Sequence, residues 1–69
     1  MSLRKRSINL AGHATSLALE PEFWEALARR AALRGISLAA LIGEIDAGRG
    51  ARPLASACRV AALEWTREP

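Results

Sequence analysis

The sequence has one cysteine, one histidine and no hydrophobic run long enough to cross a membrane. Cys58 has no second cysteine to pair with, so an internal disulfide is excluded. His13 is the only histidine, which argues against a zinc site. A membrane span needs about 18 apolar residues, and Asn9, Gly12 and His13 interrupt the segment after the N-terminal basic run, so neither a membrane protein nor a signal peptide is expected. A lone cysteine fits a reducing compartment, and we predict a cytoplasmic protein.

The chain is also short, with 69 residues, and much of its hydrophobic content is alanine. A domain of this size buries only about 60% of its unfolded surface and is marginally stable alone. Small domains usually need a disulfide, a metal or a partner subunit. With a disulfide excluded and a zinc site not expected, the composition predicts an oligomer.

A catalytic constellation is missing as well. The carboxylates have no histidine or cysteine partner in their own segments, and Gly48-Arg49-Gly50 is too short and follows no strand, so it is not a phosphate-binding loop. We therefore expect no enzyme activity, no cofactor and no metal.

What is present is a period-two pattern followed by helical patterns. Residues 15–20 alternate, with Thr15, Leu17 and Leu19 on one face, which predicts a half-buried strand. Residues 7–10 alternate too and form a short extended segment that could extend the same sheet or stay outside it. Pro21 ends the strand, because proline lacks the N–H of a ladder and suits the first turn of a helix.

Three helices are predicted: residues 21–34, a helix that Ser37 caps, and residues 54–67. Gly35 is a suitable left-handed C-cap for the first. Arg29, Arg30 and Arg34 complement its dipole as a solvated face, with phosphate contact as the alternative reading. Gly43 costs about 1 kcal/mol inside the second helix, which predicts that another backbone approaches closely there, such as the same helix of a second subunit.

The predicted organisation has a basic arm with a short extended segment at 1–13, a core of one strand and two helices at 14–47, and a C-terminal helix at 53–67. A single strand cannot satisfy its own backbone groups, so it should pair with the same strand of a second copy. Two-fold symmetry makes that pair antiparallel. The fold class is therefore α+β, mostly α, and the chain is predicted to fold as an intertwined homodimer.

The order of strand, proline turn, helix, glycine turn and serine-capped helix over residues 15–46 resembles the ribbon-helix-helix superfamily of DNA-binding proteins. A small bacterial ribbon-helix-helix subfamily with a third C-terminal helix is similar over nearly the whole chain. The stretches that carry this likeness are Lys5-Arg6-Ser7-Ile8, Gly12-His13-Ala14-Thr15-Ser16, Leu19-Glu20-Pro21-Glu22-Phe23-Trp24, Ser37-Leu38-Ala39-Ala40-Leu41-Ile42 and Leu54-Ala55-Ser56-Ala57-Cys58-Arg59-Val60.

The resemblance implies a homodimer whose paired strands enter the major groove of double-stranded DNA, as in a transcriptional repressor. Carried over residue by residue, the base-reading positions are Ala14, Ser16 and Ala18. The second helix would hold a phosphate at its N-terminus through Ser37, Leu38 and Ala39, and Arg4, Lys5 and Arg6 would form a basic arm. The dimer core would consist of Leu17, Leu19, Phe23, Trp24, Leu27, Leu41, Ile42 and Ile45.

The predicted reading face departs from the usual pattern, because Ser16 stands between two alanines, which cannot donate hydrogen bonds. Sequence-specific binding and non-specific binding through the basic arm therefore both stay open. The alternative function is a protein-interaction or antitoxin-like adaptor built on the same dimer. A higher oligomer through the helix of Trp65 is compatible with either function.

Overall fold

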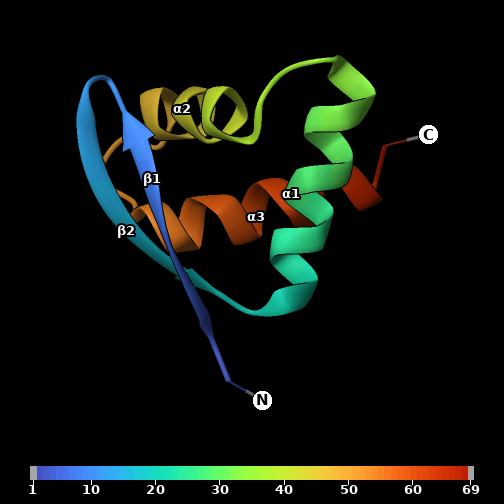
Figure 1. Cartoon of the computed structure of the whole chain (residues 1–69). Helices are drawn as coiled ribbons and strands as arrows, with labels where there is room; N and C mark the ends of the chain where they lie inside the picture. The colour runs from blue at the N-terminus through green and yellow to red at the C-terminus, as the bar shows by residue number, and fades with distance from the viewer. Residues whose placement is uncertain (1, 69) are drawn as a thin grey trace.

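A computed structural model describes residues 2–68, which form a two-stranded antiparallel hairpin followed by three helices. Figure 1 shows the hairpin along one side of the molecule, with the helices gathered against one of its faces. The elements are β1 (Arg4–Leu10), β2 (His13–Leu19), α1 (Pro21–Arg34), α2 (Leu38–Gly48) and α3 (Leu54–Thr66).

The structure corrects the number of strands per chain from one to two. Residues predicted to be a basic arm and a short extended segment form β1, which pairs with β2 along its whole length, from Arg4 opposite Leu19 to Leu10 opposite His13. Ala11 and Gly12 close the turn with positive φ angles of 51° and 84°, the backbone that matches the twist of a two-residue hairpin. A second strand within the chain thus pairs with one edge of the strand that was expected to pair with another copy.

The helix boundaries follow from residues at their ends. Pro21 occupies the first turn of α1, and Gly35 ends it in a left-handed conformation with φ 66°. The Ile36 N–H donates to the Ala31 carbonyl at 3.0 Å, which closes the helix end. Ser37 caps α2 as predicted, because its Oγ accepts from the Ala40 N–H at 3.0 Å.

The hydrophobic core lies between the hairpin and the helices. Its buried members are Ile8, Leu10, Leu17, Leu19, Trp24, Leu27, Ala31, Leu41, Ile42 and Cys58. Six of the eight residues predicted for a dimer core are among them, while Phe23 and Ile45 are half-buried and pack against the cluster. Leu19, Leu27 and Ile42 are fully buried within one chain, so a second copy is not needed to cover them.

The backbone approach predicted at Gly43 does not occur within the chain. A Cβ built on Gly43 would meet no heavy atom within 4 Å outside its own helix turn. The face of α2 at Gly43 is therefore open in the single chain. Within residues 2–68, no helix is both long and apolar enough to cross a membrane.

Candidate nucleic-acid interface

The hairpin presents one face to the core and the other to solvent, because successive side chains of a strand point to opposite sides. The buried Ile8, Leu10, Leu17 and Leu19 occupy the inner face. The register then gives the members of the outer face as three cross-strand pairs: Lys5 with Ala18, Ser7 with Ser16, and Asn9 with Ala14. Of these six residues, Ala18 is half-buried and the other five are exposed.

The structure places all three predicted base-reading positions on this outer face, where β2 contributes Ala14, Ser16 and Ala18. It also brings three polar side chains of β1 beside them: Lys5, which was predicted as part of the basic arm, and Ser7 and Asn9, which sequence reasoning missed as site residues. Part of the signal was present, because polar and apolar residues alternate from Ser7 to Leu10. The basic run before it does not alternate, which hid the extension of the strand back to Arg4.

The three basic residues of the predicted arm lie on two faces of β1. Lys5 is on the outer face, whereas Arg4 and Arg6 share the face of Ile8. The Arg6 guanidinium lies 4.8 Å from the centre of the Trp24 ring, within the range of a cation–π interaction. The Trp24 Nε1–H donates to the Arg4 carbonyl at 2.8 Å. These contacts hold the segment that was predicted to be a basic arm against α1.

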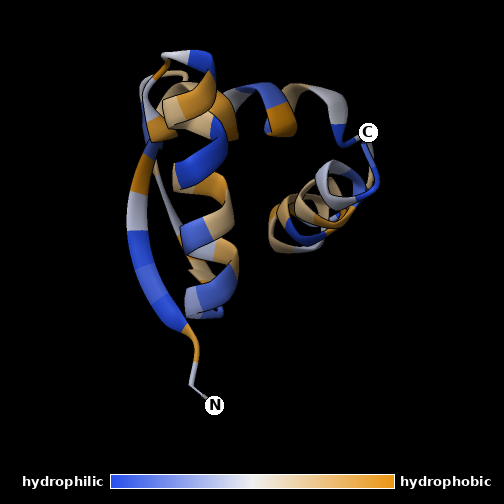
Figure 2. Cartoon of the chain, turned by 90° about the vertical axis from the view of Figure 1, so that its right-hand side faces the viewer, coloured by the Kyte–Doolittle hydropathy of each residue, from blue (hydrophilic) through white to orange (hydrophobic). Residues whose placement is uncertain are grey.

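The net positive charge of the chain resides on the hairpin. The chain has 10 basic and 7 acidic side chains, a net charge of +3. Three of those basic residues and none of the acidic ones lie within residues 4–19, which leaves seven of each sign elsewhere. Figure 2 shows the basic part of β1 as a continuous hydrophilic stretch near the N-terminus.

The arginines of α1 are engaged within the chain. Arg29 pairs with Glu25 at 2.7 Å, and Arg30 pairs with Glu68 at 2.9 Å. Arg30 also lies over the Trp65 ring.

Arg34 joins α1 to α2 through both oxygens of Glu44, at 2.6 and 3.1 Å. The hydrogen bond from Arg34 lowers the pKa of Glu44 below its ordinary value. These pairs partly neutralise the arginines of α1, whereas no ion pair to Lys5 is found in the described part of the chain.

The predicted phosphate-holding residues lie at the first turn of α2. Ser37 is exposed, Leu38 and Ala39 are half-buried, and the first turn contains no acidic residue. The Ser37 Oγ accepts a hydrogen bond from the Ala40 N–H, and the Leu41 N–H donates to the Ser37 carbonyl at 3.0 Å. The N–H groups of Leu38 and Ala39 lie before these two donors in the first turn. N–H groups at a helix N-terminus favour the binding of anions such as phosphate.

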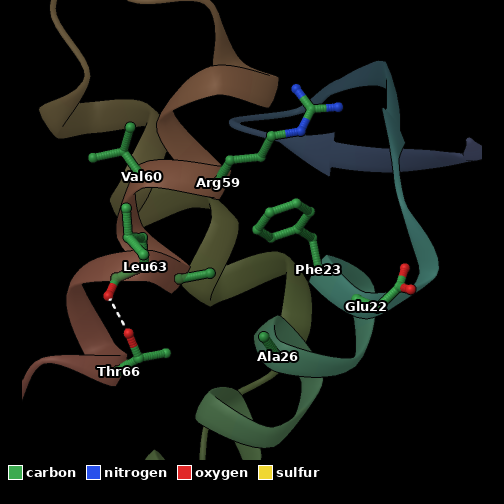
Figure 3. A pocket seen from close by; sticks show the side chains of 8 residues that line it. Glu22, Phe23, Ala26, Arg59, Val60, Leu63 and Thr66 are labelled. Atoms are coloured by element: carbon green, nitrogen blue, oxygen red, sulfur yellow. Dashed lines mark hydrogen bonds between the residues drawn. The ribbon is translucent and has the colours of Figure 1, made fainter.

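A second surface feature is an apolar groove of about 340 Å³ between α1 and α3. Figure 3 shows Phe23 projecting from α1 toward α3, with Val60 and Leu63 on the opposite side. Leu63 is 52% exposed, and Leu33 on α1 is 76% exposed.

One end of this groove is fixed by Arg59. Its Nε donates to Glu20 at 2.9 Å, and its guanidinium lies 5.8 Å from the centre of the Phe23 ring. The hydrogen bond from Arg59 holds the pKa of Glu20 below its ordinary value of 4.5. Arg59 therefore ties α3 to the end of the hairpin.

Cys58 is fully buried among hydrophobic residues of the core. Burial raises the pKa of its thiol to about 11, the opposite of an activated thiolate. Among residues 2–68, no cluster of side chains has the composition of a metal site.

A scan of protein-family models matches residues 3–66 to the model described as a ribbon-helix-helix domain. The chain belongs to the ribbon-helix-helix family. The match includes β1 and α3 as well as the strand and two helices of the predicted core. No curated protein and no solved structure matches the chain.

Members of the ribbon-helix-helix family generally bind DNA as regulators or antitoxins, and they usually dimerise. They are typically DNA-binding modules without enzymatic activity. The predicted recognition and fold class are confirmed, with the ribbon-helix-helix hairpin contained in one chain.

Proposed function

We propose that this ribbon-helix-helix protein is a homodimeric transcriptional repressor that inserts the outer face of its hairpin into the major groove of DNA. The observation that carries the proposal is the charge distribution, since the net charge of +3 resides on the exposed hairpin. Neutralising phosphates with basic side chains releases counterions and supplies much of the affinity for DNA. Such a regulator acts in the compartment that holds DNA, consistent with the predicted cytoplasmic location.

The shape of the hairpin supports the same proposal. A major groove about 12 Å wide admits a two-stranded ribbon. The inner face of the hairpin is held by the core, and the outer face carries small or polar side chains that no helix within residues 2–68 covers. Ala14, Ser16 and Ala18 then face the base edges from β2, and the first turn of α2 at Ser37 contacts a phosphate.

Dimerisation is part of the proposal and has its own test. Each strand of the hairpin keeps one edge without a partner strand in the described chain, and an open edge favours pairing with another copy. Size-exclusion chromatography with light scattering should give the mass of a dimer, twice the 7.4 kDa of the chain. A monomeric mass at the concentrations used for DNA binding would contradict this part.

The main test is fluorescence anisotropy at near-physiological salt. It compares DNA from just upstream of the protein's own coding region with a scrambled duplex of equal length. A preference of about tenfold or more for the upstream DNA supports a repressor that controls its own expression, and binding should weaken steeply with salt. Equal, salt-sensitive binding to both would indicate a non-specific basic surface, and no binding to either would refute the proposal.

The groove between α1 and α3 favours a second candidate function, an antitoxin-like adaptor that binds another protein. Its apolar lining and the exposed Leu63 and Leu33 suit a protein partner better than DNA. The distinguishing experiment is a pull-down with and without nuclease. Recovery of one partner regardless of nuclease treatment, lost on Leu63→Ser, would support the adaptor.

A further inference from the structure

The outer face of the hairpin differs in chemistry between its two strands. β1 contributes an amine, a hydroxyl and an amide through Lys5, Ser7 and Asn9, and these three side chains are exposed. β2 sets Ala18, Ser16 and Ala14 opposite them. Two of the three cross-strand pairs therefore combine a polar side chain with the methyl group of an alanine.

This asymmetry determines which strand can read bases. The amide of an asparagine can bond both N6 and N7 of adenine, and the amine of a lysine can bond O6 and N7 of guanine. Alanine has no polar atom beyond its backbone and contributes clearance and contact with a thymine methyl group. The alanines beside Lys5 and Asn9 thus leave these side chains unobstructed toward the groove floor.

The inner face explains why Lys5 differs from its basic neighbours. Arg6 lies over the Trp24 ring at 4.8 Å, and the carbonyl of Arg4 accepts from the Trp24 Nε1–H. These two contacts hold the inner face of β1 on α1, and the pairing with β2 turns Lys5 and Asn9 to the same outer side. Arg4 and Arg6 lie on the opposite face, where they can approach phosphates at the rim but not base edges.

From this geometry we infer that β1 is the base-reading strand, with Asn9 recognising an adenine and Lys5 a guanine, while β2 mainly provides clearance. The inference rests on the proposed insertion of the hairpin into the major groove. Lys5 and Asn9 are four residues apart, which is about 13 Å along an antiparallel strand. Base pairs rise about 3.4 Å each, so the two recognised base pairs lie roughly four apart, and Ser7 faces those between them.

The test is selection of binding sites from a randomised duplex DNA pool, followed by sequencing, for the full chain and three single variants. The unmodified protein should select a motif that contains an adenine and a guanine at the expected separation. Asn9→Ala should lower the preference for the adenine at least fivefold and keep the guanine. Lys5→Ala should do the reverse.

Arg4→Ala is the matched control for Lys5→Ala. It removes the same charge from the neighbouring residue on the other face, so it should weaken binding to all sequences alike and leave the motif unchanged. The outer-face substitutions touch no buried residue, and unchanged thermal melting would confirm that each variant folds.

Each result bears on one of the two proposals. A motif that survives both Asn9→Ala and Lys5→Ala would overturn the reading by β1 and leave the DNA-binding proposal standing. Binding by the unmodified protein without any selected motif would overturn the reading by β1 as well. Failure of the unmodified protein to bind the pool at all would overturn the proposed function itself.

Discussion

Replacing Gly43 by alanine distinguishes an open helix face from a hidden subunit contact. Gly43 lies inside α2, where a Cβ would meet nothing within 4 Å. Alanine is more favourable than glycine in a helix interior by about 1 kcal/mol. For a domain of this size, that gain should raise the midpoint of thermal unfolding by roughly 4–8 °C. Circular dichroism melts at a low and a high protein concentration measure the shift.

Gly35→Ala is the control for Gly43→Ala, because it should shift the melting temperature in the opposite direction. Gly35 ends α1 with φ 66°, a conformation that costs a residue with a Cβ about 1–2 kcal/mol, so Gly35→Ala should lower the melting temperature. If Gly43→Ala also lowers it, and does so most where the protein is dimeric, a second backbone must pack on Gly43. That result would refute the argument from the open face and locate the dimer contact on α2.

Three further predictions concern the contacts that hold the elements together. Trp24→Phe keeps a ring in the core but removes the donor to the Arg4 carbonyl, so it should cost about 1 kcal/mol in a urea titration; an unchanged midpoint would contradict this contact. The pKa of Glu20 is held below 4.5 by Arg59, so the pair stabilises the fold above that pH and loses this effect as the pH falls through the lowered pKa. Melting temperatures of the parent and Glu20→Gln should therefore differ at neutral pH and converge in acid, and an equal gap at both would count against the pair. Burial raises the pKa of Cys58 to about 11, so a thiol reagent should react only after denaturant is added, and rapid labelling of the folded protein would disprove that burial.

The helices were predictable from the sequence because their signals are local. Pro21, Gly35 and Ser37 mark helix ends through backbone angles and hydrogen bonds that involve only neighbouring residues. The period-two alternation likewise revealed β2, because the buried Leu17 and Leu19 alternate with the residues of the outer face. These elements required no knowledge of what lies across the core.

β1 was harder to predict because its stability comes from distant residues. The sequence Arg4-Lys5-Arg6 has the composition of a solvated tail, and only pairing with β2 and the contacts of Trp24 make it a strand. The residues in these contacts are up to 20 positions apart. Ser7 and Asn9 of the candidate DNA-binding face were missed for the same reason, and Lys5 was predicted only as part of an arm, whereas the β2 half of the face followed from the alternation.

The two-residue turn at Ala11 and Gly12 also governs how such a protein can change over time. It fixes the register of the hairpin, so alternate residues of each strand face opposite sides. The inner residues pack in the core, and the outer residues are available to contact a binding partner. Substitutions in the outer set leave the core untouched and can accumulate independently of it. The hairpin is therefore an evolvable module, in which a new target can be acquired by exchanging a few surface side chains while the scaffold beneath them stays the same.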